Sequence, residues 1–314
     1  MENTFSFLVA SLNYFGDILM TLPLATSLKA AYPESRVTFC IGSRGKGVEG
    51  IVRGVDRWIE RGSRDSFFSR KRILREMKEV RPDKIILLQQ SKYLLSLARA
   101  VNPEGIVNPP HHEGKGLPRH VTDRALIYAE ALGAYPVQEI NFREDPEASA
   151  EEIPALFFPG TTRPSKMWPV EKWLALGEMA WKEKGIVPVF AGSPADKPIS
   201  VELKKAAFPY RDLIGRTTIA ELTGLIRRSR VVVSVDNGAM HLSDFLHRPT
   251  IALFGSTDPT QVGPVQKESV AVGPRGECIL CRKHKCTHPK IYCMDQISPD
   301  EVWELFREAW EKGY

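Results

Sequence analysis

The feature that most constrains the fold of this chain is a regular alternation of short apolar runs with longer segments of helical periodicity. The runs are apolar throughout, as expected of strands that are buried on both faces of a parallel sheet. In the first part of the chain they predict strands at residues 5–10, 37–41, 85–88 and 106–107. The segments between and after them have apolar residues at helical spacing and predict helices at 17–31, 66–80, 92–101 and 119–132.

The same alternation begins again after residues 133–153, which are rich in Pro, Glu and Ala, have no clear period and are expected to be a linker. Beyond it, strands are expected at 155–158, 187–191, 231–235 and 250–254, and helices at 170–183, 200–207, 219–228, 238–246 and 300–310. The pattern predicts an α/β protein of two doubly wound domains. We assign the domains to residues 1–134 and 154–314, with a linker at 135–153, and the last helix can pack back on the first domain.

Composition excludes several classes of protein. Hydrophobic residues make up 43% of the 314 residues and charged residues 26%, which is ordinary for a soluble globular chain and rules out general disorder. The net charge of +5 is too weak a bias to indicate a nucleic-acid binder. The longest apolar runs, such as residues 251–254, are far shorter than the roughly 20 residues that cross a bilayer. The N-terminus has no basic leader and the five cysteines fit a reducing compartment, so we expect a cytoplasmic protein.

Paired domains of this kind bind ligands in a cleft where their parallel strands end, so the loops after the strands are the first places to look for function. The loop after the first expected strand contains Gly16 and Asp17. Gly16 lets the backbone turn close to a ligand, and Asp17 stands at the start of a helix, where a carboxylate is favoured. Asp17 is therefore either a helix cap or a general base that faces the cleft.

The first strand of the second half is followed by residues 158–169, with the sequence FPGTTRPSKMWP. The hydroxyls of Thr161 and Thr162 and the ammonium of Lys166 are what a phosphate needs from a loop, namely donors at short range and a positive charge. The alternative is an exposed loop in which Pro169 starts the next helix.

A third loop, residues 235–241, has the sequence VDNGAMH, in which a strand ends and a helix begins. The free backbone N–H groups and the positive end of the helix dipole at Gly238 would point into the cleft, where they can bind a diphosphate without a Gly-x-Gly-x-x-Gly motif. Asp236 and Asn237 open this stretch. His241, one turn into the helix, is either a further donor or a packed core residue.

A cluster of cysteines lies near the C-terminus, at Cys278, Cys281, Cys286 and Cys293. Four thiolates can hold a structural zinc ion in tetrahedral geometry, although a zinc ribbon would have a second Cys-x2-Cys pair. Free packed thiols and disulfides are the alternatives. A catalytic zinc is not expected, because four protein ligands leave no open position.

The order and spacing of these motifs resemble those of glycosyltransferase family 9, the ADP-heptose:lipopolysaccharide heptosyltransferases. The resemblance covers essentially the whole chain and also includes Leu22-Pro23-Leu24, Ala191-Gly192-Ser193-Pro194, Leu253-Phe254-Gly255-Ser256-Thr257-Asp258-Pro259 and Ile297-Ser298-Pro299-Asp300-Glu301-Val302. It implies two Rossmann-like domains of the GT-B type with a cleft between them. It also implies an inverting reaction that requires no metal or other cofactor for catalysis.

Carried over motif by motif, the resemblance implies that Asp17 is the general base and that Lys166 stabilises the leaving diphosphate. It places the donor at Thr161, Thr162, Lys166, Asp236, Asn237, Gly238 and His241. The family more often has a hydroxyl residue where this chain has Asn237. It also has an acidic residue near the donor sugar or ribose, for which Asp196 is the best match. Some relatives lack the cysteines, so the cluster is not expected to take part in the reaction.

The resemblance further implies that a heptosyl group passes from ADP-heptose to the lipopolysaccharide inner core, on Kdo-lipid A or its heptosylated product. This acceptor is an anionic, lipid-linked sugar. Residues 44–92 carry 14 Lys/Arg against 7 Asp/Glu, and this basic region lies in the half that would bind the acceptor. It can attract Kdo carboxylates, lipid A phosphates and the cytoplasmic face of the inner membrane. The alternative is a solvated helix face whose charges pair with one another.

Two other functions remain open. The first is a GT-B glycosyltransferase or epimerase that uses a different nucleotide sugar, because nothing in the sequence distinguishes adenine from uracil or heptose from hexose. The second and more remote one is a zinc-containing nucleic-acid-binding protein. The chain has no aromatic motif of the kind that binds RNA, so we expect no nucleic-acid partner.

Overall fold

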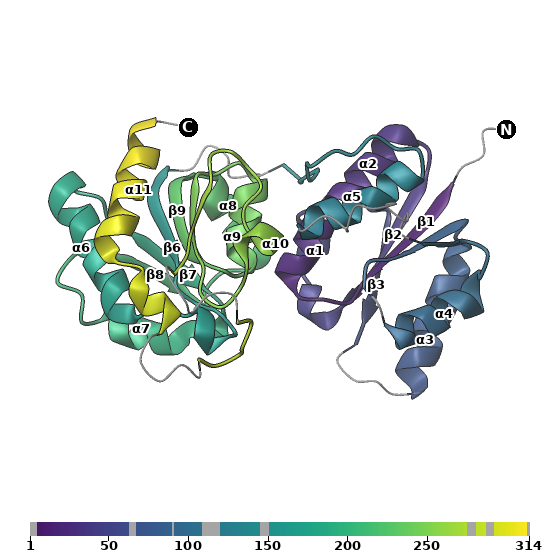
Figure 1. Ribbon diagram of the computed structural model, residues 1–314, viewed down its shortest axis with the longest axis horizontal. Coiled ribbons are helices and arrows are strands. Elements are labelled where there is room, and N and C mark those ends of the chain that lie inside the picture. Colours follow the sequence, from purple (N-terminus) through teal and green to yellow (C-terminus); the bar gives the residue numbers. More distant parts are fainter. Residues whose placement is uncertain are drawn as a thin grey trace. The chain divides into compact units, whose positions relative to one another are not determined.

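The chain folds into two compact units, Met1–Glu144 and Asp145–Tyr314, each built around one parallel sheet (Figure 1). The computed structural model describes residues 5–62, 67–89, 91–108, 120–144, 151–274, 281–286 and 292–312. No helix within these ranges is long and apolar enough to cross a membrane. The two doubly wound α/β units confirm the fold class expected from the alternating pattern.

The first unit has a five-stranded sheet in the order β3-β2-β1-β4-β5. Its strands are β1 Ser6–Ser11, β2 Arg36–Gly42, β3 Arg57–Arg61, β4 Lys84–Leu87 and β5 Ile106–Val107. Helices α1, α2 and α5 pack together on one face of the sheet, and α3 and α4 lie on the other (Figure 1). The helices are α1 Phe15–Thr21, α2 Pro23–Ala31, α3 Phe67–Val80, α4 Lys92–Val101 and α5 Val121–Ala131, with short 3-10 turns at Ser43–Gly45 and Val48–Gly50.

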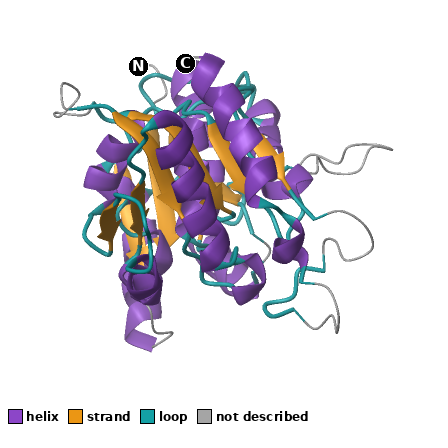
Figure 2. Cartoon of the chain, turned by 90° about the vertical axis from the view of Figure 1, so that its left-hand side faces the viewer, coloured by secondary structure: helices purple, strands orange, loops and turns teal. Residues whose placement is uncertain are grey.

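The second unit has a six-stranded sheet in the order β11-β10-β9-β6-β7-β8. Its strands are β6 Ile153–Phe158, β7 Val189–Gly192, β8 Arg211–Ile214, β9 Ser229–Val235, β10 Thr250–Leu253 and β11 Val270–Val272. Helices α6, α7 and α11 lie on one face, and α8 and α9 on the other (Figure 1). Figure 2 shows helices flanking the strands. The helices are α6 Val170–Lys184, α7 Lys197–Leu203, α8 Ile219–Arg227, α9 Gly238–Phe245, α10 Pro259–Val262 and α11 Pro299–Lys312, with 3-10 turns at Pro164–Lys166, Pro194–Asp196 and Cys293–Gln296.

Aromatic side chains fill the core of the second unit. The ring of Phe157 on β6 lies 5.7 Å from Trp173, 5.4 Å from Phe190 and 6.3 Å from Phe306, measured between ring centroids. Phe306 belongs to α11, which packs against α6, β9 and β10. The last helix therefore buries its apolar face in the second unit. The sequence alone had left open that this helix packs on the first unit.

Two of the differences between the structure and the predicted elements have clear physical reasons. The helix expected at 17–31 is divided at Leu22 into α1 and α2, because Pro23 cannot donate a hydrogen bond in a helix interior and instead starts a new helix. The strands β3, β8 and β11 were not predicted. All three lie at sheet edges and carry exposed or partly exposed residues, so they do not form the apolar runs by which the buried strands were found.

The first part of the expected linker is fixed to the first unit. Val52 and Phe142 form an antiparallel bridge. The amide of Arg53 donates to the carbonyl of Asn141 at 2.6 Å, and the amide of Arg143 donates to the carbonyl of Ile51 at 2.8 Å. These residues thereby extend the first unit up to its boundary at Glu144.

Each sheet has one point at which the direction of strand addition reverses. It lies between β1 and β4 in the first unit and between β6 and β9 in the second. At such a point the loops at the carboxyl ends of the two central strands diverge to opposite faces, which leaves a crevice in which α/β proteins bind ligands. The loops after β1, β4, β6 and β9 are therefore the places where a site is expected.

Candidate active site

The loops after β6 and β9 are joined directly at the switch point of the second sheet. Phe158, the last residue of β6, is in register with Ser234 of β9. The side-chain amide of Asn237 donates to the carbonyl of Gly160 at 2.8 Å. The structure thus brings together the two segments, Thr161–Lys166 and Asn237–Gly238, that the sequence indicated separately.

Asn237 also caps helix α9. Its Oδ1 accepts from the amide of Met240 at 3.0 Å and from the hydroxyl of Ser234 at 3.1 Å. The side chain therefore fixes the start of α9 and the loop after β6 at once, leaving the amides of the first helical turn to point away from the sheet. Asparagine is among the best N-cap residues, so this chain keeps the helix N-terminus although the family more often has a hydroxyl residue here.

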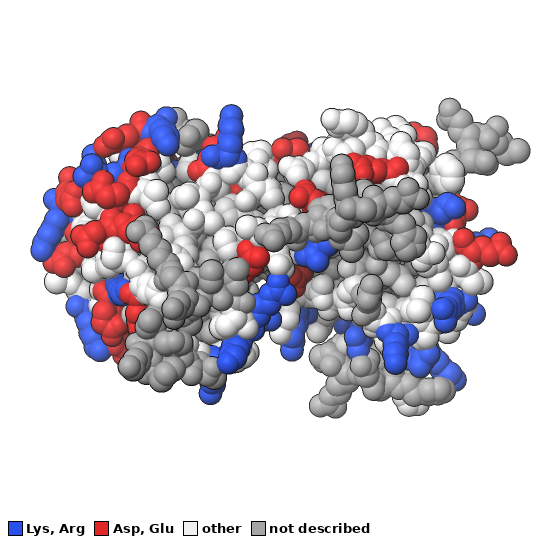
Figure 3. Space-filling model, in the orientation of Figure 1, with Lys and Arg blue, Asp and Glu red and all other residues white. Residues whose placement is uncertain are grey.

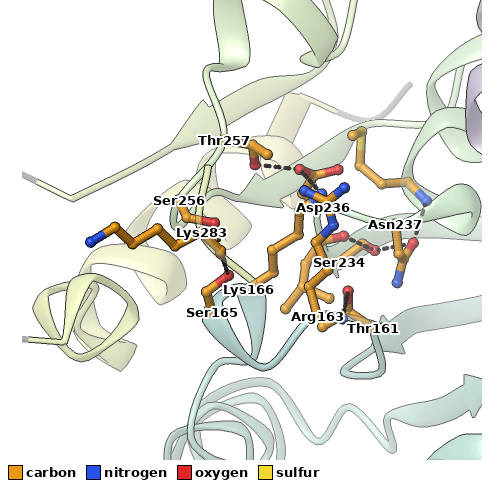
Figure 4. A network of polar contacts seen from close by, with 12 residues as sticks. Thr161, Arg163, Ser165, Lys166, Ser234, Asp236, Asn237, Ser256, Thr257 and Lys283 are labelled. Atoms are coloured by element: carbon orange, nitrogen blue, oxygen red, sulfur yellow. Dashed lines mark hydrogen bonds and ion pairs between the residues drawn. The ribbon is translucent and has the colours of Figure 1, made fainter. Parts of the chain in front are cut away.

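Lys166 and Asp236 form an ion pair at the same place. The Lys166 Nζ lies 2.6 Å from Asp236 Oδ2, and the two side chains are 12% and 5% exposed. The hydroxyl of Thr257, in the loop after β10, donates to the same oxygen at 2.5 Å. Figure 4 shows Lys166 and Arg163 both extending from their loop toward Asp236. Asp236 therefore holds the lysine in position rather than presenting a carboxylate of its own to solvent.

A second set of hydrogen bonds fixes the loop after β6 from its other side. The Ser165 hydroxyl donates to the carbonyl of Lys283 at 2.6 Å and lies 2.9 Å from the Ser256 hydroxyl (Figure 4). The amide of Ser165 donates to the carbonyl of His284 at 3.2 Å, and Cys293 Sγ donates to the carbonyl of Ser165 at 3.8 Å. The cysteine segment therefore supports the loop that carries Lys166.

Asp196 lies at the same end of the second sheet. Its Oδ2 accepts from the amide and the hydroxyl of Ser193 at 2.8 and 2.7 Å. A Cβ added to Gly160 would come within 2.1 Å of the Asp196 carboxyl carbon, and one added to Gly192 would come within 3.0 Å of its Oδ2. The carboxylate thus packs directly on the backbone beside Thr161, and contact of Asp196 with the donor stays a prediction.

This close approach makes Gly160 hard to replace. In Gly160→Ala the new methyl group must displace the Asp196 carboxylate or shift the loop. We expect a loss of about 1–3 kcal/mol in the free energy of unfolding and weaker nucleotide binding. Thermal unfolding and calorimetric titration with ADP would measure both. The matched control is Gly50→Ala, where an added Cβ meets nothing within 4 Å; equal effects in the two variants would contradict the packing described.

The other predicted donor residues lie on these two loops. Thr161 accepts from the amide of Arg163 at 3.4 Å, and the neighbouring Thr162 is exposed. His241 lies one turn into α9 and is 5% exposed, which is the burial of a packed histidine. Its role as a donor to a ligand stays a prediction. Arg163 was not singled out from the sequence. Its place between Thr162 and Lys166 was the signal that could have marked it as a further cation of this loop.

In the first unit, Asp17 stands at the third position of α1. Its Oδ2 accepts from the amide of Tyr14, the residue that caps this helix, at 3.2 Å. Arg44, in the turn after β2, donates to the Tyr14 hydroxyl, and its guanidinium carbon lies 4.4 Å from the ring centre. Gln89, after β4, accepts from the amide of Leu12 at 3.0 Å. Asp17 is thus not itself the N-cap but helps to cap α1 from the third helical position, beside an exposed aromatic ring and an arginine. Its role as general base stays a prediction.

Helix α9 is anchored at its other end by a buried carboxylate. Asp244 accepts from the amides of Val265 and Gln266 at 2.6 and 3.2 Å. Burial raises the pKa of this carboxyl from 3.8 to about 6, against the effect of these hydrogen bonds. Asp244 therefore fastens the loop before β11 to the helix whose N-terminus lies in the site.

The raised pKa gives a testable dependence of stability on pH. Between pH 4 and 6 the native state binds more protons than the unfolded state, so the contribution of Asp244 to the free energy of unfolding falls as the pH rises through this window. The fall should total about 3 kcal/mol. Urea unfolding of the wild type and of Asp244→Asn across this range would measure it. The difference between the two proteins should shrink with rising pH, and parallel curves would show that Asp244 does not titrate there.

The cysteine cluster is only partly within the described residues. Cys278 lies outside them. Among the described residues, which include Cys281, Cys286 and Cys293, no group of three or more His, Cys, Asp or Glu side chains is arranged to hold a metal ion. Cys281 is exposed, whereas Cys293 is buried against the loop after β6. Zinc binding by the four thiols therefore stays a prediction.

The chain is similar to several known proteins. The family model for glycosyltransferase family 9 (heptosyltransferase) matches residues 118–292. Lipopolysaccharide heptosyltransferase 1 of Salmonella typhimurium is 24% identical over 298 residues, which cover 84% of this chain and 92% of that protein. The crystal structure of the glycosyl transferase family 9 from Veillonella parvula superposes with a TM-score of 0.84 at 19% identity, covering 100% of this chain and 99% of that one. Escherichia coli heptosyltransferase WaaC with ADP gives 0.75 at 22% identity, covering 97% and 99%.

The solved relatives share the two-unit GT-B architecture, and the family match spans the loops that carry Thr161, Lys166 and Asp236. The chain therefore belongs to glycosyltransferase family 9, the heptosyltransferase family, and is a glycosyltransferase.

Proposed function

We propose that the protein transfers a heptosyl group from ADP-heptose to the lipopolysaccharide inner core, on Kdo-lipid A or heptosyl-Kdo-lipid A. The observation that carries the proposal is the junction of two loops at the switch point of the second sheet. There the Asn237–Gly160 hydrogen bond and the Lys166–Asp236 pair join a cationic loop to a helix N-terminus. The named activity of the Salmonella relative and the ADP bound to the Escherichia coli one support the same donor.

The diphosphate of the donor would lie between the Thr161–Lys166 segment and the first turn of α9. Heptosyl transfer breaks the bond between the anomeric carbon and the diphosphate oxygen, so negative charge grows on the leaving group. Lys166, Arg163 and the N–H groups at Gly238 offer positive potential to that charge, and one well-placed donor can contribute about 3 kcal/mol in the transition state. We propose that these groups take the place of a divalent cation.

The acceptor hydroxyl would attack from the opposite face, which inverts the configuration at the anomeric carbon. Its proton passes to the carboxylate of Asp17, its oxygen forms the new glycosidic bond, and ADP leaves with the bonding electron pair. A carboxylate is a weak base in water, so it helps mostly once bond formation has made the hydroxyl more acidic. We place the reaction at the cytoplasmic face of the inner membrane, because the acceptor is anchored in a lipid.

The test is turnover of ADP-heptose with Kdo-lipid A and, separately, with its heptosylated product. One of the two should be consumed with release of ADP, and the acceptor used would assign the position in the inner core. The proposal would be wrong if neither acceptor were glycosylated while a different nucleotide sugar supported transfer.

The second candidate is a family 9 enzyme that uses another nucleotide sugar. A ligand that binds only the native state raises the unfolding temperature more the more tightly it binds, so ADP, UDP and GDP can be compared at equal concentration. ADP should give the largest shift. Stabilisation by UDP or GDP alone would favour the alternative donor.

We also propose that Cys278, Cys281, Cys286 and Cys293 hold a structural zinc ion that the transfer reaction does not use. Metal content measured on protein purified without chelator should approach one zinc per chain. Cys281→Ser is expected to lower it and to reduce thermal stability without changing the rate of turnover at low temperature. The site would be excluded if the purified protein contained no metal and still had full activity and full stability.

A further inference from the structure

The outer face of α3, in the first unit, belongs to the basic region 44–92 and contains none of the residues assigned to the donor loops or to the role of base. Phe68, Lys71, Arg75 and Lys78 recur at intervals of three and four residues and therefore lie along one side of the helix. All four are exposed, and the Phe68 ring is 81% exposed. We call these four residues the α3 face. The opposite side of the helix, with Ile73 and Met77, is fully buried.

The charges around this helix are strongly unbalanced. Glu76 pairs with Arg72 at 3.1 Å, and Glu79 contacts both Arg57 at 3.0 Å and Arg75 at 3.7 Å. The two carboxylates of the helix are thus engaged by arginines. The remaining surface holds an excess of cations, and a shallow hollow in it is lined by Lys71, Leu74, Arg75, Lys78, Glu79 and Arg81. Lys and Arg side chains gather over this part of the molecule in Figure 3.

We propose that the α3 face docks on the surface of a bilayer that contains anionic phospholipids. Several cations spread along one helix side attract a layer of negative headgroups, and a single exposed aromatic ring at the same surface can enter the boundary between headgroups and acyl chains. A flat lipid surface also needs no deep pocket. The inference rests on the proposed function in one respect, which is the use of the docking surface: an enzyme with a lipid-linked acceptor must reach it at a membrane.

The test measures binding to vesicles in the absence of donor and acceptor, so it is independent of the transferase activity. The full-length protein should bind vesicles of phosphatidylglycerol and phosphatidylethanolamine, and not vesicles of phosphatidylcholine alone. Raising the salt concentration should release it, because exposed charges are screened. The triple variant K71E/R75E/K78E should bind on the order of 100-fold more weakly, from the known contribution of each cation near an anionic surface.

A matched control separates the α3 face from net charge. The variant K182E/K204E/K205E makes the same change in net charge on exposed lysines of the second unit. It should bind anionic vesicles with nearly the affinity of the wild type. Equal losses in the two triple variants would overturn the proposal, because attraction would then follow total charge. The proposal would also be overturned if the protein bound duplex DNA and showed no preference for anionic vesicles.

The aromatic ring is tested separately. Phe68→Ser should weaken vesicle binding by about 10-fold, the value expected for losing the burial of one such ring, without altering circular dichroism. The affinity for ADP should be unchanged in all α3-face variants, because the donor is proposed to bind the loops of the second unit. If vesicle binding by both Phe68→Ser and K71E/R75E/K78E matched that of the wild type, the docking surface would not be α3. An inactive wild type that still bound anionic vesicles through α3 would instead refute the proposed function alone.

Discussion

Replacing Asp17 by asparagine should lower kcat by about 10³-fold, within the range typical of losing a general base, and leave the affinity for ADP unchanged. Asparagine cannot accept the proton of the acceptor hydroxyl. Its side-chain oxygen can still accept from the amide of Tyr14, as Asp17 does at 3.2 Å. The variant should therefore keep the cap of α1 and the fold of the loop, and lose only the chemistry.

The capping role makes a matched control necessary, because an acid at a helix start also contributes to stability. Asp123 occupies the equivalent third position of α5 and accepts from the Gln138 amide at 3.0 Å. Asp123→Asn should change thermal stability about as much as Asp17→Asn and leave kcat as in the wild type. Steady-state rates and calorimetric titration with ADP would measure both variants. A rate for Asp17→Asn within a few-fold of the wild type, or an equal loss in Asp123→Asn, would remove Asp17 from the role of base.

The sequence predicted each loop of the candidate site but not the contacts between them. Lys166 and Asp236 were both identified, yet their ion pair depends on β6 and β9 being neighbours in the sheet. Apolar runs indicate which segments are strands and do not give their lateral order. The same holds for Ser165 and Ser256, whose contact joins loops that are far apart in the chain.

Residues with long side chains were the hardest to assign from sequence. Arg163 extends toward Asp236, and Arg44 stacks on the ring of Tyr14 from a different strand end. Such side chains reach several positions from one backbone site, so their partners follow from tertiary structure and not from local pattern. The available signals were only that each follows an expected strand and that Arg163 lies between Thr162 and Lys166.

Asn237 shows how a departure from a family pattern can be understood once the contacts are known. A hydroxyl side chain at this position could cap α9 but would have a single polar atom for all of its hydrogen bonds. Asn237 accepts from the Met240 amide with one atom and donates to the Gly160 carbonyl with another. The substitution therefore keeps the helix N-terminus and adds a direct link between the two loops of the site.

Lys166→Ala should weaken ADP binding by about 10²-fold, close to the loss of one charge-assisted contact together with a new unfavourable charge. The variant removes the cation nearest the proposed diphosphate position. It also leaves Asp236, which is only 5% exposed, without the ammonium that lies 2.6 Å away in the wild type. A buried carboxylate that has lost its ammonium partner would repel the diphosphate and should lower the unfolding temperature as well.

The double variant Lys166→Ala/Asp236→Asn separates these two effects. It removes both charges of the pair, while the asparagine can still accept from the Thr257 hydroxyl, which donates to Asp236 in the wild type. If Lys166 binds the diphosphate directly, the double variant should recover stability and part of the ADP affinity, and remain about 10-fold weaker than the wild type. It should also discriminate less between ADP and AMP, because the lost contact is to the diphosphate. Complete recovery of ADP affinity would mean that Lys166 serves only as the partner of Asp236, and the diphosphate would then have to bind elsewhere.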